Sequence, residues 1–340
     1  MPKEVEKQYK AIINRYINTK SENDLYAGQK FSRRFIEKEI LPEEVIGIHK
    51  SALMELFKDA PEDFWHSFDF LIEMMIHYGL ALQEHQSLIR KQEELDLEMK
   101  IAEKVQNTLL KTRVPTFSNL DIGFLTVPAK QMSGDYIYFL SDDSNYASVA
   151  VADVIGKGIP AALCMSMIKF GMDNMQQQNS SPHVVLDVVN RIVEDSVDDS
   201  MFISMFYGKY EVEGSVFSYS SAGHEPVLLY KSATNTFIEL DAKGLLLGVQ
   251  PNVTYEERSV VLDEGDFIAM MTDGVTETRT EDGFIDDEVI KEILKTVKDE
   301  SAQEIADTVY QQLGEMQNFH LHDDFSIVIF KKGYNSGLSN

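Results

Sequence analysis

The chain has 340 residues and a formal net charge of -25, and 44% of its residues are hydrophobic. This length and composition predict two folded domains. The negative charge argues against binding to nucleic acid, which needs a basic surface. The amino terminus is polar and no apolar run approaches the roughly 18 residues of a membrane span. The single cysteine, Cys164, excludes an internal disulfide and fits a reducing, cytoplasmic location.

Residues 1–86 are expected to form a helical domain. Pro42 and Pro61 each precede acidic residues and an apolar stretch, as at the first turn of a helix. Phe64, Phe68 and Leu71 begin a wide apolar face that helix packing would bury. This face is either the core of a small bundle or a surface for a dimer or another partner.

Residues 87–117 are expected to form a helical linker, and residues 88–110 contain neither glycine nor proline. Leu88, Leu95, Ala102 and Leu109 lie seven residues apart, which is an imperfect heptad pattern over about three repeats. Two interpretations remain open. The segment is either a coiled coil or a single amphipathic helix that lies on the following domain.

Residues 118–333 are expected to form an α+β domain, followed by a tail at 334–340. Short strands with turn signals dominate, and the helices fall in separate blocks. The predicted strands are 121–127, 146–151, 202–212, 216–220, 227–230, 260–262, 267–271 and 326–330. The predicted helices are 160–177, 182–196, 287–298 and 301–316.

Four aspartates in similar contexts recur across this region, each beside a strand end or a turn. They are Asp135, Asp153, Asp273 and Asp323. Any one of them, taken alone, is explained by capping of a turn. Together they indicate a shared site, and oxygen-only ligands favour Mg²⁺ or Mn²⁺ over zinc. His320 and His322 have no further histidine or cysteine nearby, which disfavours a zinc site there.

The order of the motifs resembles that of the SpoIIE/RsbU-type metal-dependent serine/threonine protein phosphatases. The motifs are SGD, ADVIGKG, SAGHEP, TDGVTE and HDDFS, between Ser133 and Ser326. The amino-terminal segments 29–40 and 69–86 are similar to the RsbU branch of this family, so the resemblance extends over the whole chain. It implies a PPM-type phosphatase fold, which is a β-sandwich flanked by helices, after a helical bundle and a helical linker.

The resemblance also implies the roles of individual residues around two Mn²⁺ or Mg²⁺ ions. Asp153 would bridge both ions, and the backbone carbonyl of Val154 would bind one of them. Asp273 and Asp323 would complete the shell of the other ion, and Asp135 would lie in or beside the shell of the first. Two such ions can acidify a water, orient the phosphoryl group and neutralise charge, with no covalent phosphoenzyme.

Several residues are expected to support this site. Asp324 is the neighbouring alternative to Asp323, and strand alternation allows only one of the two to point inward. Gly134, Gly156 and Gly274 would allow tight turns and close backbone approach. Gly223 and His224 would shape a loop, with a general-acid role for His224 as the less favoured reading.

The resemblance implies a substrate and partners as well. The substrate would be a phosphorylated STAS-domain anti-anti-sigma factor, and its dephosphorylation would activate a stress sigma factor. An RsbT-like switch kinase would bind the amino-terminal domain and linker of a homodimer and activate the phosphatase. A catalytically silent scaffold is the alternative function.

One departure from the eukaryotic relatives concerns the arginine that binds phosphate near their first acidic motif. Here only Lys130 stands in that neighbourhood. We therefore expect substrate phosphate to rest mainly on the metal ions, with low activity until a partner orders the site.

Overall fold

The computed structural model describes residues 3–38, 40–142, 145–155, 159–175, 180–196, 201–280 and 283–333. The chain divides into two compact units, Met1–Asp96 and Leu97–Asn340. Within the described ranges, no helix combines the length and the apolar character that crossing a membrane requires. The tail at 334–340 lies outside the described residues.

The first unit is a small helical bundle, as predicted. It contains α1 (Lys3–Thr19), α2 (Glu22–Glu37), α3 (Pro42–Leu56) and the beginning of α4 (Glu62–Leu109). Pro42 occupies the first turn of α3, where its missing N–H costs nothing. Phe31 and Phe35 of α2 pack with Val5 and Ile48 from the two neighbouring helices. These side chains form the main core of the bundle.

Helix α4 is continuous over 48 residues and includes most of the predicted linker. Many of its apolar side chains are exposed, among them Leu88, Leu95, Ile101 and Val105. An isolated helix of this kind gains little from burial. These exposed apolar side chains would be stabilised by contact with another surface. Both the coiled coil and the single amphipathic helix stay predictions.

The second unit contains two antiparallel five-stranded sheets and a two-stranded hairpin. The first sheet has the order β1 (Leu120–Val127), β12 (Phe325–Lys332), β9 (Phe267–Met271), β6 (Val227–Lys231), β7 (Thr236–Leu240). The second has the order β2 (Asp135–Ser141), β3 (Tyr146–Ile155), β4 (Phe202–Glu211), β5 (Val216–Ala222), β8 (Arg258–Val261). The hairpin joins β10 (Arg279–Thr280) and β11 (Gly283–Phe284).

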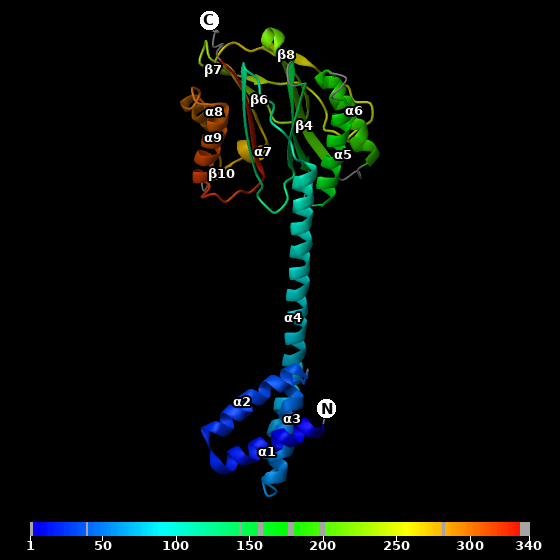
Figure 1. Cartoon of the computed structure of the whole chain (residues 1–340), viewed down its shortest axis with the longest axis vertical. Helices are drawn as coiled ribbons and strands as arrows, with labels where there is room; N and C mark the ends of the chain where they lie inside the picture. The colour runs from blue at the N-terminus through cyan, green and yellow to red at the C-terminus, as the bar shows by residue number, and fades with distance from the viewer. Residues whose placement is uncertain are drawn as a thin grey trace. The chain divides into compact units, whose positions relative to one another are not determined.

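The two sheets face each other across an apolar core, and helices cover their outer faces (Figure 1). Helices α5 (Ile159–Met175) and α6 (Pro182–Ser196) pack on the second sheet, and α8 (Asp287–Thr296) and α9 (Ala302–Met316) pack on the first. Two short helices, α7 (Asp273–Thr276) and η2 (Glu213–Ser215), complete the described elements. The β-sandwich flanked by helices is thus confirmed.

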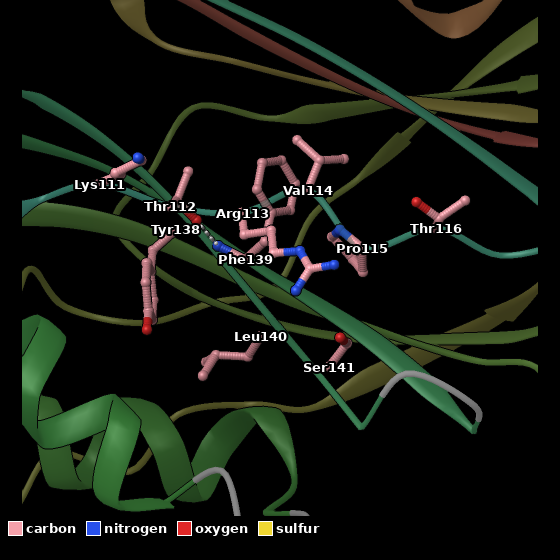
Figure 2. Close-up of a pocket in the computed structure, with 10 residues that line it drawn as sticks. All are labelled: Lys111, Thr112, Arg113, Val114, Pro115, Thr116, Tyr138, Phe139, Leu140 and Ser141. Atoms are coloured by element: carbon pink, nitrogen blue, oxygen red, sulfur yellow. Dashed lines mark hydrogen bonds between the residues drawn. The ribbon is translucent and has the colours of Figure 1, made fainter.

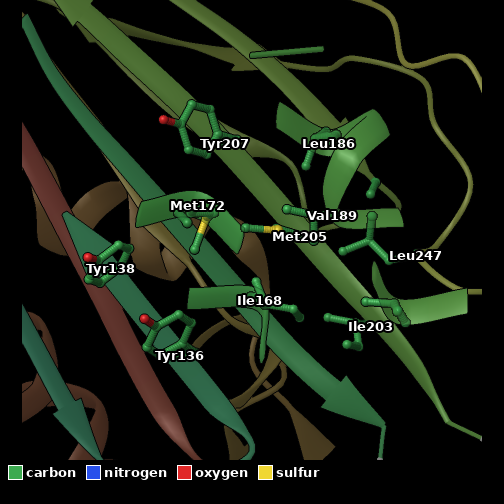
Figure 3. Packing of buried hydrophobic residues seen from close by; sticks show 14 of the residues in the cluster. Tyr136, Tyr138, Ile168, Met172, Leu186, Val189, Ile203, Met205, Tyr207 and Leu247 are labelled. Carbon is green, nitrogen blue, oxygen red and sulfur yellow. The ribbon is translucent and has the colours of Figure 1, made fainter. Parts of the chain in front are cut away.

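The packing under α5 and α6 shows why the strands of the second sheet are apolar on both faces. Ile168 and Met172 of α5 and Leu186 of α6 contact the outer side chains of β2 and β4, including Tyr138 and Met205 (Figure 3). The inner side chains of the same strands fill the core between the sheets. Burial on both faces removes the alternation that marks a half-buried strand.

Most predicted elements agree with the structure. The prediction missed β2, β7 and the hairpin, and it ended the strand of Tyr146 at Val151. The observed β3 continues to Ile155, so Asp153 lies within the strand rather than just beyond it. The strand β2 is almost wholly buried and therefore lacks a polar alternation.

Cys164 is a residue of α5 that faces the core, and we predict that it is unreactive in the folded protein. Burial raises the pKa of its thiol to about 11, because a thiolate loses its hydration there. At pH 8 the reaction with a disulfide reagent should be about 100-fold slower than in unfolded chain, where the thiol pKa is about 8.5. The same chain in guanidinium is the control, and native and unfolded rates within a few-fold of each other would contradict the prediction.

Candidate active site

Two aspartates of the second sheet lie directly opposite each other at one end of the sandwich. Asp135, the first residue of β2, pairs with Asp153 of β3. Ile137 and Val151 lie two positions further into these strands, and both belong to the core between the sheets. Because side chains alternate along a strand, the two aspartates face the same inter-sheet space. The register thus brings together two of the predicted site residues.

The first sheet reaches the same place through Thr272, which follows β9. The Thr272 hydroxyl donates to Oδ2 of Asp135 over 2.7 Å. The backbone N–H of Ser326 donates to Thr272 Oγ1 over 3.2 Å. Thr272 is 0% exposed and Asp135 is 5% exposed. This buried contact therefore links the two sheets at the acidic end.

Asp324 holds the loop that leads into Asp135. Its Oδ1 accepts the backbone N–H of Ala129 at 2.7 Å, and its Oδ2 accepts that of Gly134 at 2.6 Å. Asp324 is buried, whereas its neighbour Asp323 is exposed. Of the two residues, the one that points inward is thus Asp324. The assignment of Asp323 as the metal ligand stays a prediction.

Gly134 marks a point where three oxygens of the site converge. A side-chain carbon added there would lie 3.3 Å from the Val154 carbonyl oxygen, 3.4 Å from Asp153 Oδ1 and 3.6 Å from Asp324 Oδ2. A larger residue would crowd these oxygens. The carbonyl of Val154 and the carboxylate of Asp153, which the sequence predicted as a ligand pair, therefore approach the same small region.

Asp273 and Asp323 line one small cavity of about 160 Å³. Its walls come from the short helix α7, the residues after it, the end of α9 and the turn before β12. The lining residues are Asp273, Gly274, Glu277, Thr278, Arg279, Gln317, His322 and Asp323. The structure thus forms one group of oxygens around Gly134 and a second around this cavity.

Gly274 joins the cavity to the buried group. A side-chain carbon at this position would lie 2.0 Å from the backbone oxygen of Asp324. The Asp323–Asp324 backbone therefore packs directly on Gly274, and no other residue fits without moving it. This contact explains the glycine in the TDG sequence.

The buried carboxylates destabilise one another in the absence of a cation. Burial raises the pKa of Asp135 well above its usual range, and the charges of Asp153 and Asp324 raise it further. Hydrogen bonds from Ser326 and Thr272 oppose this increase. Anionic oxygens held together away from water are typical of a site that binds a hard cation.

His224 lies in a packing position. Burial lowers the pKa of its imidazole to about 4, so the ring is neutral at pH 7. Its Nδ1 lies 3.2 Å from the Ser204 hydroxyl, and its ring contacts Phe206. Gly223, with φ +64°, makes the turn before it, and a side chain there would meet Leu246. These contacts favour a structural role for His224 over that of a general acid.

Three further residues that the sequence analysis discussed remain to be placed, namely Gly156, His320 and His322. Gly156 lies outside the described residues. The ring centroids of His320 and His322 lie 5.4 Å apart. Across the described part of the chain, no three His, Cys, Asp or Glu side chains form a complete metal-binding group.

These donors fit Mn²⁺ or Mg²⁺. They are carboxylate and carbonyl oxygens, the ligands that hard divalent cations prefer. The repulsion around Asp135 supplies a reason for cation binding that does not depend on any relative. Asp135, Asp153 and Val154 are the residues that would hold one ion, and Asp273 and Asp323 would serve the other.

A cavity of about 510 Å³ lies beside the edge strand β2 and is a different feature. Thr112 accepts the backbone N–H of Phe139 there, at 2.9 Å, and the basic side chains of Lys111 and Arg113 belong to its wall (Figure 2). None of its ten lining residues is acidic or belongs to the predicted site. The larger cavity is therefore not the candidate metal site.

The sequence reasoning missed three residues that the structure adds to the site. They are Thr272, Gln106 and Arg279. Thr272 stands beside Asp273 and could have been found from the buried end of its strand. Gln106 lies on α4, 5% exposed, and its Nε2 donates to the Ser133 carbonyl at 2.9 Å. No local pattern distinguishes Gln106 or Arg279 from ordinary surface residues.

Comparison with solved structures defines the class of the fold. The SiaA-PP2C domain of Pseudomonas aeruginosa matches with a TM-score of 0.61 and 19% identity, over 71% of this chain and 98% of that chain. The PP2C phosphatase domain and a regulatory fragment of SpoIIE from Bacillus subtilis match with a TM-score of 0.56 and 18% identity, over 64% of each chain. The second unit therefore has the fold of the PP2C or PPM phosphatases.

Comparison of sequences defines the family. Residues 143–332 match Stage II sporulation protein E (SpoIIE), and residues 7–81 match the Phosphoserine phosphatase RsbU N-terminal domain. The chain is 48% identical over 328 residues to Phosphoserine phosphatase RsbU of Bacillus subtilis, covering 96% of this chain and 98% of that protein. The chain belongs to the RsbU family of PPM-type serine phosphatases, which act in partner-switching control of the stress response.

We predict that Asp153→Asn removes metal-dependent stabilisation without weakening the metal-free fold. The substitution removes one of several neighbouring negative charges, so the free energy of unfolding in EDTA should be unchanged or higher. Mn²⁺ at a hundredfold excess over its Kd should stabilise the unchanged chain by about 2.7 kcal/mol, and the variant by much less. Thermal unfolding with and without Mn²⁺ measures both effects. Asp299→Asn on the surface is the control, and an equal Mn²⁺ effect in Asp153→Asn would contradict the prediction.

We also predict that Gln106→Leu weakens metal binding through the loop before Asp135. The variant leaves the Ser133 carbonyl without its donor, and Ser133 Oγ accepts the backbone N–H of Asp135 at 3.1 Å. Loss of such a supporting contact typically weakens metal affinity by about 10-fold or more. A Mn²⁺ titration of phosphatase activity gives the apparent affinity. Thr108→Ala on the same helix is the control, and equal Mn²⁺ affinities in Gln106→Leu and the unchanged chain would refute the coupling.

Proposed function

We propose that the chain is a Mn²⁺- or Mg²⁺-dependent phosphatase that removes phosphate from phosphoserine or phosphothreonine in a STAS-domain anti-anti-sigma factor. The observation that carries the proposal is the meeting of Asp135, Asp153, the Val154 carbonyl and Asp324 at one end of the sandwich. The neighbouring cavity adds Asp273 and Asp323. Similarity to Phosphoserine phosphatase RsbU supports the choice of phosphoserine.

The residues of the chain have separate tasks in this proposal. Asp135, Asp153, Asp273, Asp323 and the Val154 carbonyl hold two divalent cations. When bound, these cations lower the pKa of the attacking water and neutralise charge on the phosphoryl group.

Other residues keep the ligands in place. Thr272 fixes Asp135 by a hydrogen bond, and Asp324 fixes the loop at Gly134 through two backbone N–H groups. Holding the ligands before substrate arrives reduces the reorganisation that the reaction requires. Cys164 is buried in a hydrophobic core and has no part in this scheme. The reaction is a direct attack of water, with no phosphoenzyme.

The regions of the chain divide the remaining roles. Residues 1–86 bind an RsbT-like switch kinase and form a homodimer, residues 87–117 act as the linker, and residues 118–333 catalyse. The exposed apolar side chains of α4 support a role in contacts with other chains. The relative's name and the match to the RsbU N-terminal domain support the partner-switching role. This system would act in the cytoplasm, where the sigma factor is.

The direct experiment measures phosphate release from a phosphorylated STAS-domain protein in Mn²⁺. The intact chain and Asp153→Ala are compared, each with and without the candidate switch kinase. We expect metal-dependent release that rises with the kinase and falls by at least 100-fold in the variant. No release under any condition, from protein whose folding is verified, would favour the silent scaffold.

A further inference from the structure

We propose that Arg279 binds the phosphoryl group of the substrate, in the cavity that Asp273 and Asp323 line. This inference rests on the proposed phosphatase function and identifies the group that holds the phosphate. The sequence offered only Lys130 for this purpose. Both side chains are exposed, but only Arg279 is among the residues that line the cavity.

The charge of the cavity creates the need for such a residue. Asp273, Glu277 and Asp323 are all part of its wall, and the chain as a whole carries a net charge of -25. A phosphomonoester dianion is repelled by this surface unless positive charge is placed near it. Arg279 is the one lysine or arginine in the described lining of the cavity.

The Arg279 side chain lies against an aromatic ring of the β10–β11 hairpin. Arg279 pairs across the hairpin with Phe284, and its guanidinium carbon lies 4.9 Å from the centre of the Phe284 ring. A guanidinium that stacks on an aromatic face keeps its edge N–H donors directed outward in the ring plane. These donors match two oxygens of one phosphate group.

Gln317, at the end of α9, belongs to the same wall and is 8% exposed. Its Nε2 is enclosed by protein atoms and has no hydrogen-bond partner among the described residues. This nitrogen is therefore closed off from the cavity and offers no donor there, so the phosphate would depend on the Arg279 guanidinium.

The size of the cavity also agrees with a phosphate group. Its volume of about 160 Å³ is roughly five times the share of one water molecule in the liquid. This space accommodates a phosphoryl group.

The test compares Arg279→Ala and Arg279→Lys with the unchanged chain, all as full-length protein loaded with Mn²⁺. Inorganic phosphate is the probe, and its Kd is measured by calorimetry and as competitive inhibition of phosphoserine-peptide hydrolysis. We expect Arg279→Ala to raise the Kd of phosphate and the KM of the peptide by at least 10-fold. Arg279→Lys keeps the charge but loses the paired donors, and its effect should be intermediate.

Two further variants make the result specific. Phe284→Leu removes the aromatic face and should raise the Kd of phosphate by a few-fold. Arg258→Ala removes an exposed arginine that pairs with Glu256 and is the charge-matched control, with no change expected. The Mn²⁺-induced rise in Tm should be the same in all of these variants, because none of them is a proposed metal ligand.

The possible failures are distinguishable. Each of three results would overturn the role of Arg279. Phosphate affinity could be unchanged in Arg279→Ala, or it could fall in Lys130→Ala in its place. The third such result is loss of the Mn²⁺-induced rise in Tm in Arg279→Ala. Absence of phosphate binding to the unchanged chain would overturn it too. Phosphate binding that depends on Arg279, in a chain that hydrolyses no phosphoserine substrate, would support the inference and contradict the proposed function.

Discussion

The hydrogen bond from Thr272 to Asp135 joins the two sheets at the end where the acidic residues gather. Acidic residues usually avoid such places, because a buried carboxylate loses its hydration and repels its neighbours. Here the inner faces of both sheets are apolar along most of their length, and only their common end carries Asp135, Asp153 and Asp324. Holding these carboxylates together lowers the free energy of unfolding of the metal-free sandwich, and a bound divalent cation would offset this loss.

Backbone contacts determine how closely the acidic residues approach one another. Asp324 binds two N–H groups of the loop before Asp135, and the backbone beside Asp324 packs on Gly274. A displacement at either point would therefore be transmitted to the whole acidic end. Glycine is required at position 274, because the backbone oxygen of Asp324 occupies the space of a side chain there. The glycine of the TDG motif is thus needed for close packing, and the aspartates of the motifs are the residues that we propose as metal ligands.

Contacts from outside the sandwich strands also reach the site. Gln106 of α4 binds the Ser133 carbonyl, and Lys169 of α5 donates to the carbonyls of Leu109 and Lys111 at the end of α4. The last carbonyl groups of a helix lack donors within the helix and carry partial negative charge, so a positive charge at the C-terminal end is favourable. The end of α4 is therefore attached both to the acidic loop and to the helix layer of the second sheet. A shift of this end of α4 would therefore act on both the acidic loop and the α5 layer.

The sequence by itself was enough to predict the class of the fold and to select the candidate aspartates from the order of their motifs. Strand ends, glycine turns and acidic residues are local features, which a single segment of sequence displays. The sequence determined the helical bundle for the same reason, through Pro42 and the apolar faces. Only the tertiary structure decided that Asp324 points inward, that Asp153 lies within β3, and that Arg279 lines the cavity of Asp273. These facts depend on strand register and on contacts between separate segments of the chain, such as that of Thr272 with Asp135. Side-chain patterns along one segment carry no record of which distant segment will lie against it.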